Sequence, residues 1–126
     1  MIYGIGVDLV EIVRIDRAWK RWGTRFEKRL FTPTEIEFCR SRPRPASCLA
    51  MRFAAKEAFS KAVGLGLRSN ELLWRDIEVQ HNARGKPFLA LYGTAASVAR
   101  KIKMKSSHLS LTDERGLAQA FVVVEV

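Results

Sequence analysis

The chain has few residues of the kinds that build disulfide frameworks, zinc sites and flexible linkers. Its 126 residues include only two cysteines, two histidines and four prolines. Cys39 and Cys48 show neither CxxC spacing nor a histidine cluster nearby, so we expect free thiols in a reducing compartment rather than a disulfide or a metal site. Repeats and low-complexity segments are missing as well, and we expect a single domain over residues 1–126.

Long apolar runs are also missing. Asp8 and Glu11 interrupt the only apolar start, so we expect neither a signal peptide nor a membrane span. With 48% hydrophobic and 28% charged residues, the composition is that of a globular protein and argues against disorder. We therefore expect a cytoplasmic protein without a membrane partner.

Acidic residues are scarce beside basic ones, with 13 against 22, and the formal net charge is +9. The excess is concentrated in residues 14–29, where apolar residues recur at helical spacing. This pattern predicts an amphipathic helix with a basic outer face, bent or shortened at Gly23. Such a face suits an acidic partner surface, because opposite charge speeds encounter. A merely solvated face is the plain alternative, and a nucleic-acid-binding module is another, although no recognised readout motif accompanies the charge.

The most informative segment is RFAAKEAFSKAVGLG, residues 52–66. Glu57 and Lys61 are four residues apart and share a helix face, opposite an apolar stripe of alanines and Phe59. Alone, they would form an exposed salt bridge worth only about 0.3–0.5 kcal/mol. Gly64 is well placed to end this helix in a left-handed conformation. Gly66 then permits either a turn or a close approach of backbone to a ligand.

Asp8 changes the interpretation of this pair. Residues 2–7 read as a short strand, and Asp8 follows where the apolar run ends. A carboxylate beside apolar residues needs a partner or a metal. Mg²⁺ is commonly held by one or two carboxylates, with phosphate oxygens and waters completing its octahedron. Asp8 and Glu57 would supply the carboxylates and Lys61 a cation for phosphate charge, which suits chemistry on a pyrophosphate.

The remaining pattern is α+β, an antiparallel sheet packed against a long central helix and flanking helices. Thr32 and Glu35 form a capping box for a short helix through Arg40. A connecting loop is expected over residues 69–74, hairpins over 76–92 and 107–126, and a second amphipathic helix over 94–104. The run 120–126 is apolar nearly throughout, as in a strand covered on both faces, either by this chain's own helices or by another subunit.

Three segments together carry a family resemblance: GIGVDLVEIVRI, FAAKEAFSKAVGLG and HLSLTDERGLAQAFVVVE. Over essentially its whole length the chain resembles the bacterial holo-acyl-carrier-protein synthases, the small 4′-phosphopantetheinyl transferases. The resemblance implies that fold, assembled as a homotrimer with active sites between neighbouring subunits. It also implies Mg²⁺-dependent transfer of 4′-phosphopantetheine from coenzyme A to a serine of an apo-acyl carrier protein, releasing adenosine 3′,5′-bisphosphate.

The resemblance also assigns roles to residues. It implies Asp8 and Glu57 as metal ligands and, with Lys61, as the catalytic residues. The serine proton would pass to Glu57 or to a metal-held water, and we favour the water because a coordinated carboxylate is a poor base. The implied coenzyme A contacts are Arg52, Phe53, Ser60, Lys61, Gly64, Gly66, Lys86 and Pro87. The acidic carrier protein would dock on Arg14, and by helix geometry on Arg17, Arg21 and Arg25.

One position departs from the family pattern. Many members have a histidine where this chain has Asp113, and a carboxylate cannot donate the same hydrogen bonds as an imidazole. Asp113 is either a further metal or water ligand, or the mark of a specialised member with another carrier or slower turnover. His108 matches a family histidine and is expected to be structural. A non-catalytic scaffold that only binds carrier protein is a further alternative.

Overall fold

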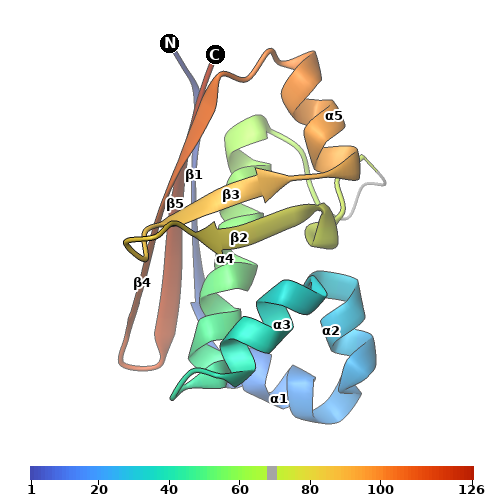
Figure 1. Cartoon of the computed structure of the whole chain (residues 1–126), viewed down its shortest axis with the longest axis vertical. Helices are drawn as coiled ribbons and strands as arrows, with labels where there is room; N and C mark the ends of the chain where they lie inside the picture. Colours follow the sequence, from blue (N-terminus) through green and yellow to red (C-terminus); the bar gives the residue numbers. More distant parts are fainter. Residues whose placement is uncertain (68–70) are drawn as a thin grey trace.

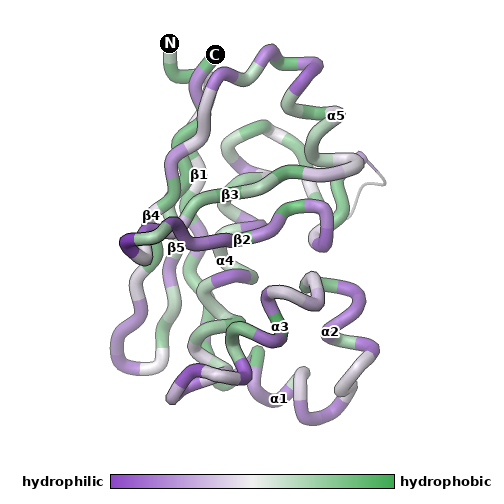
Figure 2. The backbone as a smooth tube through the Cα atoms, viewed as in Figure 1, coloured by the Kyte–Doolittle hydropathy of each residue, from purple (hydrophilic) through white to green (hydrophobic). Residues whose placement is uncertain are grey.

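One long helix, α4 (Pro45–Val63), organises the molecule. In this computed structural model, which describes residues 1–67 and 71–126, α4 lies between a three-stranded sheet and a strand pair that crosses it on the other side (Figure 1). Its alanine and phenylalanine stripe is buried as predicted, and Gly64 ends it with a φ of 77°. Figure 2 shows apolar residues concentrated along α4 and the neighbouring strands, with hydrophilic residues prominent on α1 and α2.

The larger sheet is antiparallel, with strand order β1-β5-β4, and its strands are β1 (Ile2–Glu11), β4 (Ser106–Glu114) and β5 (Leu117–Glu125). The first strand is longer than the sequence predicted. Asp8 therefore lies inside β1, opposite Ala120 of β5, rather than at a strand end. The smaller sheet pairs β2 (Ile77–His81) with β3 (Pro87–Leu91), close to the predicted hairpin.

The other helices surround one end of α4 and flank the smaller sheet (Figure 1). The predicted basic helix is divided into α1 (Ile12–Trp22) and α2 (Thr24–Leu30), because Gly23 turns the chain with a φ of 52°. The capping box of α3 (Pro33–Arg40) is present as predicted. The short helix η1 (Trp74–Asp76) precedes β2, and α5 (Gly93–Lys101) ends earlier than expected. Residues 68–70 lie outside the described residues, and they include the first two residues of the expected connecting loop.

Two glycines allow β1 to lie directly on α4. A Cβ at Gly4 would stand 2.0 Å from the Ala62 carbonyl oxygen, and one at Gly6 would stand 1.8 Å from that of Ala58. Only a residue without a side chain fits this contact. Asp8 is the next residue after Gly6 on the same face of β1, so the strand carries it against α4.

The α4-facing side of the large sheet is buried, whereas its outer side is not. Residues of β5 alternate between buried and less buried positions, so this chain's own helices cover only one face of the expected two-sided strand. On the outer side, Val7 and Phe121 pair across strands and are each 43% exposed. Ile5 and Leu9 of β1 extend this apolar surface.

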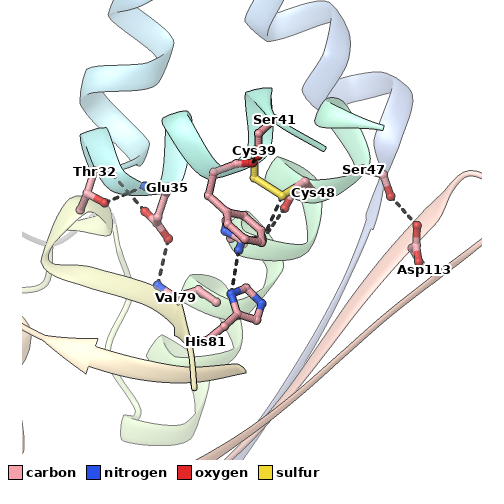
Figure 3. Close-up of a disulfide and its surroundings, with 11 residues drawn as sticks. Thr32, Glu35, Cys39, Ser41, Ser47, Cys48, Val79, His81 and Asp113 are labelled. Atoms are coloured by element: carbon pink, nitrogen blue, oxygen red, sulfur yellow. Dashed lines mark hydrogen bonds between the residues drawn. A yellow bond between two sulfur atoms is a disulfide. The ribbon is translucent and has the colours of Figure 1, made fainter. Parts of the chain in front are cut away.

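The expectation of free thiols is wrong for this structure, because Cys39 and Cys48 form a disulfide (Figure 3). The turn after α3 brings the end of that helix against the start of α4, with 5.4 Å between the two Cα atoms. That separation lies in the ordinary range for a disulfide. Spacing rules for short motifs missed the pair because the α3–α4 packing, not the sequence separation, sets the distance.

The two ends of the chain meet at the top of the large sheet (Figure 1). The Met1 amino group donates to the Val126 carbonyl (3.0 Å), and the Val126 amide donates to the Met1 carbonyl (2.8 Å). Among the described helices, none is both long and apolar enough to cross a membrane.

Candidate active site

Asp8 and Lys61 meet at the contact between β1 and α4. Lys61 Nζ donates to Asp8 Oδ1 (3.1 Å) and to the Val7 carbonyl oxygen (2.9 Å). The Asp8 side chain is 17% exposed and that of Lys61 53% exposed. The ammonium group is thus held beside the carboxylate by a backbone acceptor while one side of it remains open to solvent.

Glu57 lies one helical turn before Lys61 and opens on the same pocket as Asp8. This pocket, of about 310 Å³, lies where β1, α1, α2 and α4 meet. Phe53 and Arg14 also line it. Glu57 accepts a hydrogen bond from the indole Nε1 of Trp74 (3.3 Å). The structure therefore brings together the two carboxylates that the sequence singled out from segments about fifty residues apart.

The donor set fits a hard divalent cation. Two carboxylates on one pocket supply oxygen ligands and leave coordination positions for phosphate oxygens and waters, which is how Mg²⁺ is usually held. Within residues 1–67 and 71–126 no group of three or more histidine, cysteine or acidic side chains forms a ligand cluster. Two carboxylates suffice for an ion that shares its remaining positions with a substrate.

Arg52 points away from this pocket. It precedes Glu57 by five residues, which is roughly 140° around the helix, and lines a second pocket of about 460 Å³ with Pro87, His81 and Asp113. The Arg52 side chain is buried, donates to the Cys48 carbonyl (3.3 Å) and stacks over a ring of α3. Burial lowers its pKa to about 10, while Glu35 raises it and a neighbouring arginine lowers it further.

The other residues that the resemblance assigned to coenzyme A are spread along this helix and the β2–β3 turn. Ser60 is buried, and its hydroxyl donates to the Glu57 carbonyl oxygen (2.7 Å). Gly64 and Gly66 follow Lys61 at the C-terminal end of α4. Lys86 is exposed in the β2–β3 turn. Within one chain, these residues therefore fall on two sides of α4.

The four predicted docking arginines are all exposed: Arg14, Arg17 and Arg21 on α1 and Arg25 on α2. Arg21 and Arg25 lie over the ring of Trp22, at 4.9 and 5.9 Å from its centroid. Because Arg14 also lines the Asp8 pocket, the basic surface reaches the mouth of the candidate active site.

Asp113 and His108 each form a side-chain hydrogen bond within this chain. Ser47 donates a 2.5 Å hydrogen bond to Asp113 Oδ2, at the start of α4 (Figure 3). His108 Nε2 lies 2.6 Å from Glu125 Oε1 on the adjacent strand. Hydrogen bonds from His108 and then Ser106 lower the pKa of Glu125. Asp113 lines the Arg52 pocket, not the pocket of Asp8 and Glu57.

Sequence reasoning missed two residues next to this site, Trp74 and Lys56. Lys56 precedes Glu57 and is entirely buried, which the helical pattern of residues 52–66 did not reveal. Trp74 is seventeen residues from the carboxylate that it contacts. Only the position of Lys56 directly before Glu57 could have drawn attention to it in the sequence, and no feature of the sequence indicated that Trp74 lies beside the site.

Comparison with known proteins gives a consistent result. The model of the 4′-phosphopantetheinyl transferase superfamily matches residues 4–121. A holo-acyl-carrier-protein synthase of Trichlorobacter lovleyi is 48% identical over 125 residues, covering 99% of this chain and 98% of that protein. The corresponding protein of Halothermothrix orenii is 43% identical with the same coverage.

Solved structures agree with the sequence matches. The holo-acyl-carrier-protein synthase of Neisseria meningitidis superposes with a TM-score of 0.91 at 40% identity over the full length of both chains. That of Helicobacter pylori, solved in complex with coenzyme A, gives 0.85 at 33% identity, covering 96% of this chain and 99% of that one. The similarity thus spans nearly all of the chain, in sequence and in fold.

Proposed function

This chain belongs to the 4′-phosphopantetheinyl transferase superfamily, and we propose that Asp8, Glu57 and Lys61 carry its transfer of 4′-phosphopantetheine from coenzyme A to a serine of an apo-acyl carrier protein. The observation that supports this assignment is the convergence of both carboxylates on one pocket, with the ammonium group bound to Asp8. The reaction forms a bond between the serine oxygen and phosphorus. It breaks the pyrophosphate bond and releases adenosine 3′,5′-bisphosphate.

Asp8 and Glu57 would hold Mg²⁺, which neutralises charge on the phosphoryl oxygens and the leaving group. Lys61 adds a point charge whose position is set by its bonds to Asp8 and to the Val7 carbonyl. Phe53 lines the pocket and supplies an apolar wall beside the carboxylates. The arrangement supplies positioning and electrostatic stabilisation, which are the main needs of phosphoryl transfer.

The nucleotide part of coenzyme A would be held partly by a neighbouring subunit. Arg52 and Pro87 line a different pocket from Asp8 and Glu57, and Lys86 directly precedes Pro87, so we infer that one chain does not present both sets to the same molecule. An exposed apolar surface formed by Ile5, Val7, Leu9 and Phe121 offers the contact for that neighbour. We propose a homotrimer with active sites shared between neighbouring subunits.

The acidic carrier protein would dock along α1 and α2. Arg14, Arg17, Arg21 and Arg25 provide positive charge that leads to the pocket mouth, and such charge chiefly accelerates encounter. We place the reaction in the cytoplasm. Disulfides are rare there, so the bond between Cys39 and Cys48 is unusual for this location.

The test is intact-mass spectrometry of an apo-acyl carrier protein incubated with coenzyme A, Mg²⁺ and the protein. We expect a gain of one phosphopantetheine group, abolished by Asp8→Asn and by Glu57→Gln. Glu37→Gln is the matched control, because it makes the same chemical change on the exposed side of α3. Carrier binding without any mass gain, in a folded wild-type protein, would replace the transferase by a scaffold.

A further inference from the structure

Trp74 joins the candidate metal ligand to the most deeply buried ion pair of the described chain. Its indole nitrogen donates to Glu57 Oε1 (3.3 Å), and its main-chain carbonyl accepts from Lys56 Nζ (3.2 Å). Lys56 and Glu57 are consecutive residues of α4, so the tryptophan bridges two neighbouring side chains that leave the helix in different directions. One residue thus touches both the inside of the core and the edge of the pocket.

The inner end of this bridge is rigid. Lys56 Nζ also donates to Glu35 Oε1 (2.6 Å) and to the Leu30 carbonyl (2.7 Å), and both charged side chains are wholly inaccessible to solvent. Glu35 in turn accepts from the Val79 amide (3.0 Å), as seen in Figure 3. Burial lowers the pKa of Lys56, and Glu35 opposes that shift. Every proton of the ammonium group has an acceptor, so the Trp74 carbonyl is held in one position.

The indole ring is held as well. Phe53, which lines the Asp8 pocket, stacks on Trp74 with 6.4 Å between ring centroids and an interplanar angle of 22°. The guanidinium of Arg29, a residue of α2, lies 5.9 Å from the centroid of the Trp74 ring. With its main chain and ring both fixed, the indole N–H points at Glu57 without a search over rotamers.

We propose that Trp74 is a positioning residue that orients the Glu57 carboxylate for a divalent cation, with the buried Lys56–Glu35 pair as its anchor. The inference rests on the proposed function, because it takes Glu57 as a metal ligand. An indole N–H can only donate, so it engages one oxygen of the carboxylate and restricts the orientation of that group at the edge of the pocket. Partners that orient a metal-binding carboxylate in this way typically change metal affinity or activity 10–100-fold.

Trp74→Phe tests the proposal, because it keeps the aromatic packing and removes only the donor. The measurement is the dissociation constant of Mn²⁺ in the presence of coenzyme A, read from the electron paramagnetic resonance signal of free Mn²⁺. We expect it to rise about tenfold. The Mg²⁺ concentration for half-maximal transfer should rise alongside, with the KM for coenzyme A at saturating Mg²⁺ little changed.

Trp19→Phe is the matched control. Trp19 also donates its indole proton to a glutamate, Glu27 (2.7 Å), and neither of these residues lines the Asp8 pocket. This variant should bind Mn²⁺ as the wild type does. A Trp74→Phe protein that is folded and binds Mn²⁺ with unchanged affinity would overturn the positioning role.

The wild type and Asp8→Asn separate that failure from failure of the site itself. If Asp8→Asn weakens Mn²⁺ binding while Trp74→Phe does not, only the positioning role is wrong. If Asp8→Asn binds Mn²⁺ as tightly as the wild type, the metal lies elsewhere and the proposed site is wrong together with the role of Trp74.

Discussion

Adding one methyl group at Gly6 should separate β1 from α4. The new Cβ would stand 1.8 Å from the Ala58 carbonyl oxygen, about 1.6 Å short of an ordinary 3.4 Å contact. Both groups belong to backbone inside regular elements, so neither can rotate away as a flexible side chain would. Gly6→Ala therefore belongs at the upper end of overpacking costs, and we expect a loss of about 3 kcal/mol or more in the free energy of unfolding.

Urea denaturation followed by circular dichroism measures this loss, and thermal unfolding should show a midpoint lower by roughly 10 °C. Protein concentration must be held constant, because assembly would add to apparent stability. Gly66→Ala serves as the control, since no atom of the described residues lies within 4 Å of the Cβ it would carry. Because Asp8 follows Gly6 on the same face, the folded fraction of Gly6→Ala should also bind Mn²⁺ more weakly. An unfolding free energy within 0.5 kcal/mol of wild type, a difference typical of surface changes, would refute the close strand–helix contact.

Three further predictions concern charge. Lys56→Met should lower the free energy of unfolding by about 3–5 kcal/mol, because Glu35 would remain buried without its partner. Urea denaturation measures this loss, and an unchanged midpoint would show that the buried ion pair does not stabilise the fold. Burial and two neighbouring arginines lower the pKa of His81 below its ordinary 6.5. Just below pH 6.5 the unfolded chain gains this proton while the folded chain does not, so the free energy of unfolding should decrease as the pH falls through that window. His81→Gln should flatten this dependence of stability on pH. Arg14→Glu should raise the KM for carrier protein about tenfold, with little change in the KM for coenzyme A. Lys101→Glu makes the same charge reversal on α5 and should leave the KM for carrier protein unchanged. Equal effects of the two variants would show that net charge, and not a docking site at Arg14, sets this KM.

Local signals in the sequence were sufficient for most helices and strands. The capping box at Thr32 and Glu35, the left-handed Gly64 and the break at Gly23 each act within one or two helical turns, and the structure has all three. Bounds were less accurate where tertiary pairing extends an element. β1 continues past Asp8 because β5 offers partners up to Glu11, which no local pattern of residues 2–7 reveals.

The candidate site was predictable only in part. Spacing placed Glu57 and Lys61 on one helix face, and the carboxylate of Asp8 beside an apolar run suggested a metal site shared with Glu57. The buried Lys56–Glu35 pair joins residues twenty-one positions apart, and no local pattern indicated it. Long-range packing decides such contacts, and the bond between Cys39 and Cys48 was missed for the same reason.

The paired termini turn the chain into a nearly closed ring. Because Met1 and Val126 already exchange hydrogen bonds, a linker of a few residues would join them without disturbing β1 or β5. Closing a ring of this length removes conformational freedom mainly from the unfolded chain, which would stabilise the fold by on the order of 4 kcal/mol in the loop-entropy model. New ends opened in the exposed turn at Asn82–Gly85 would then yield a circular permutant with the Asp8 pocket intact.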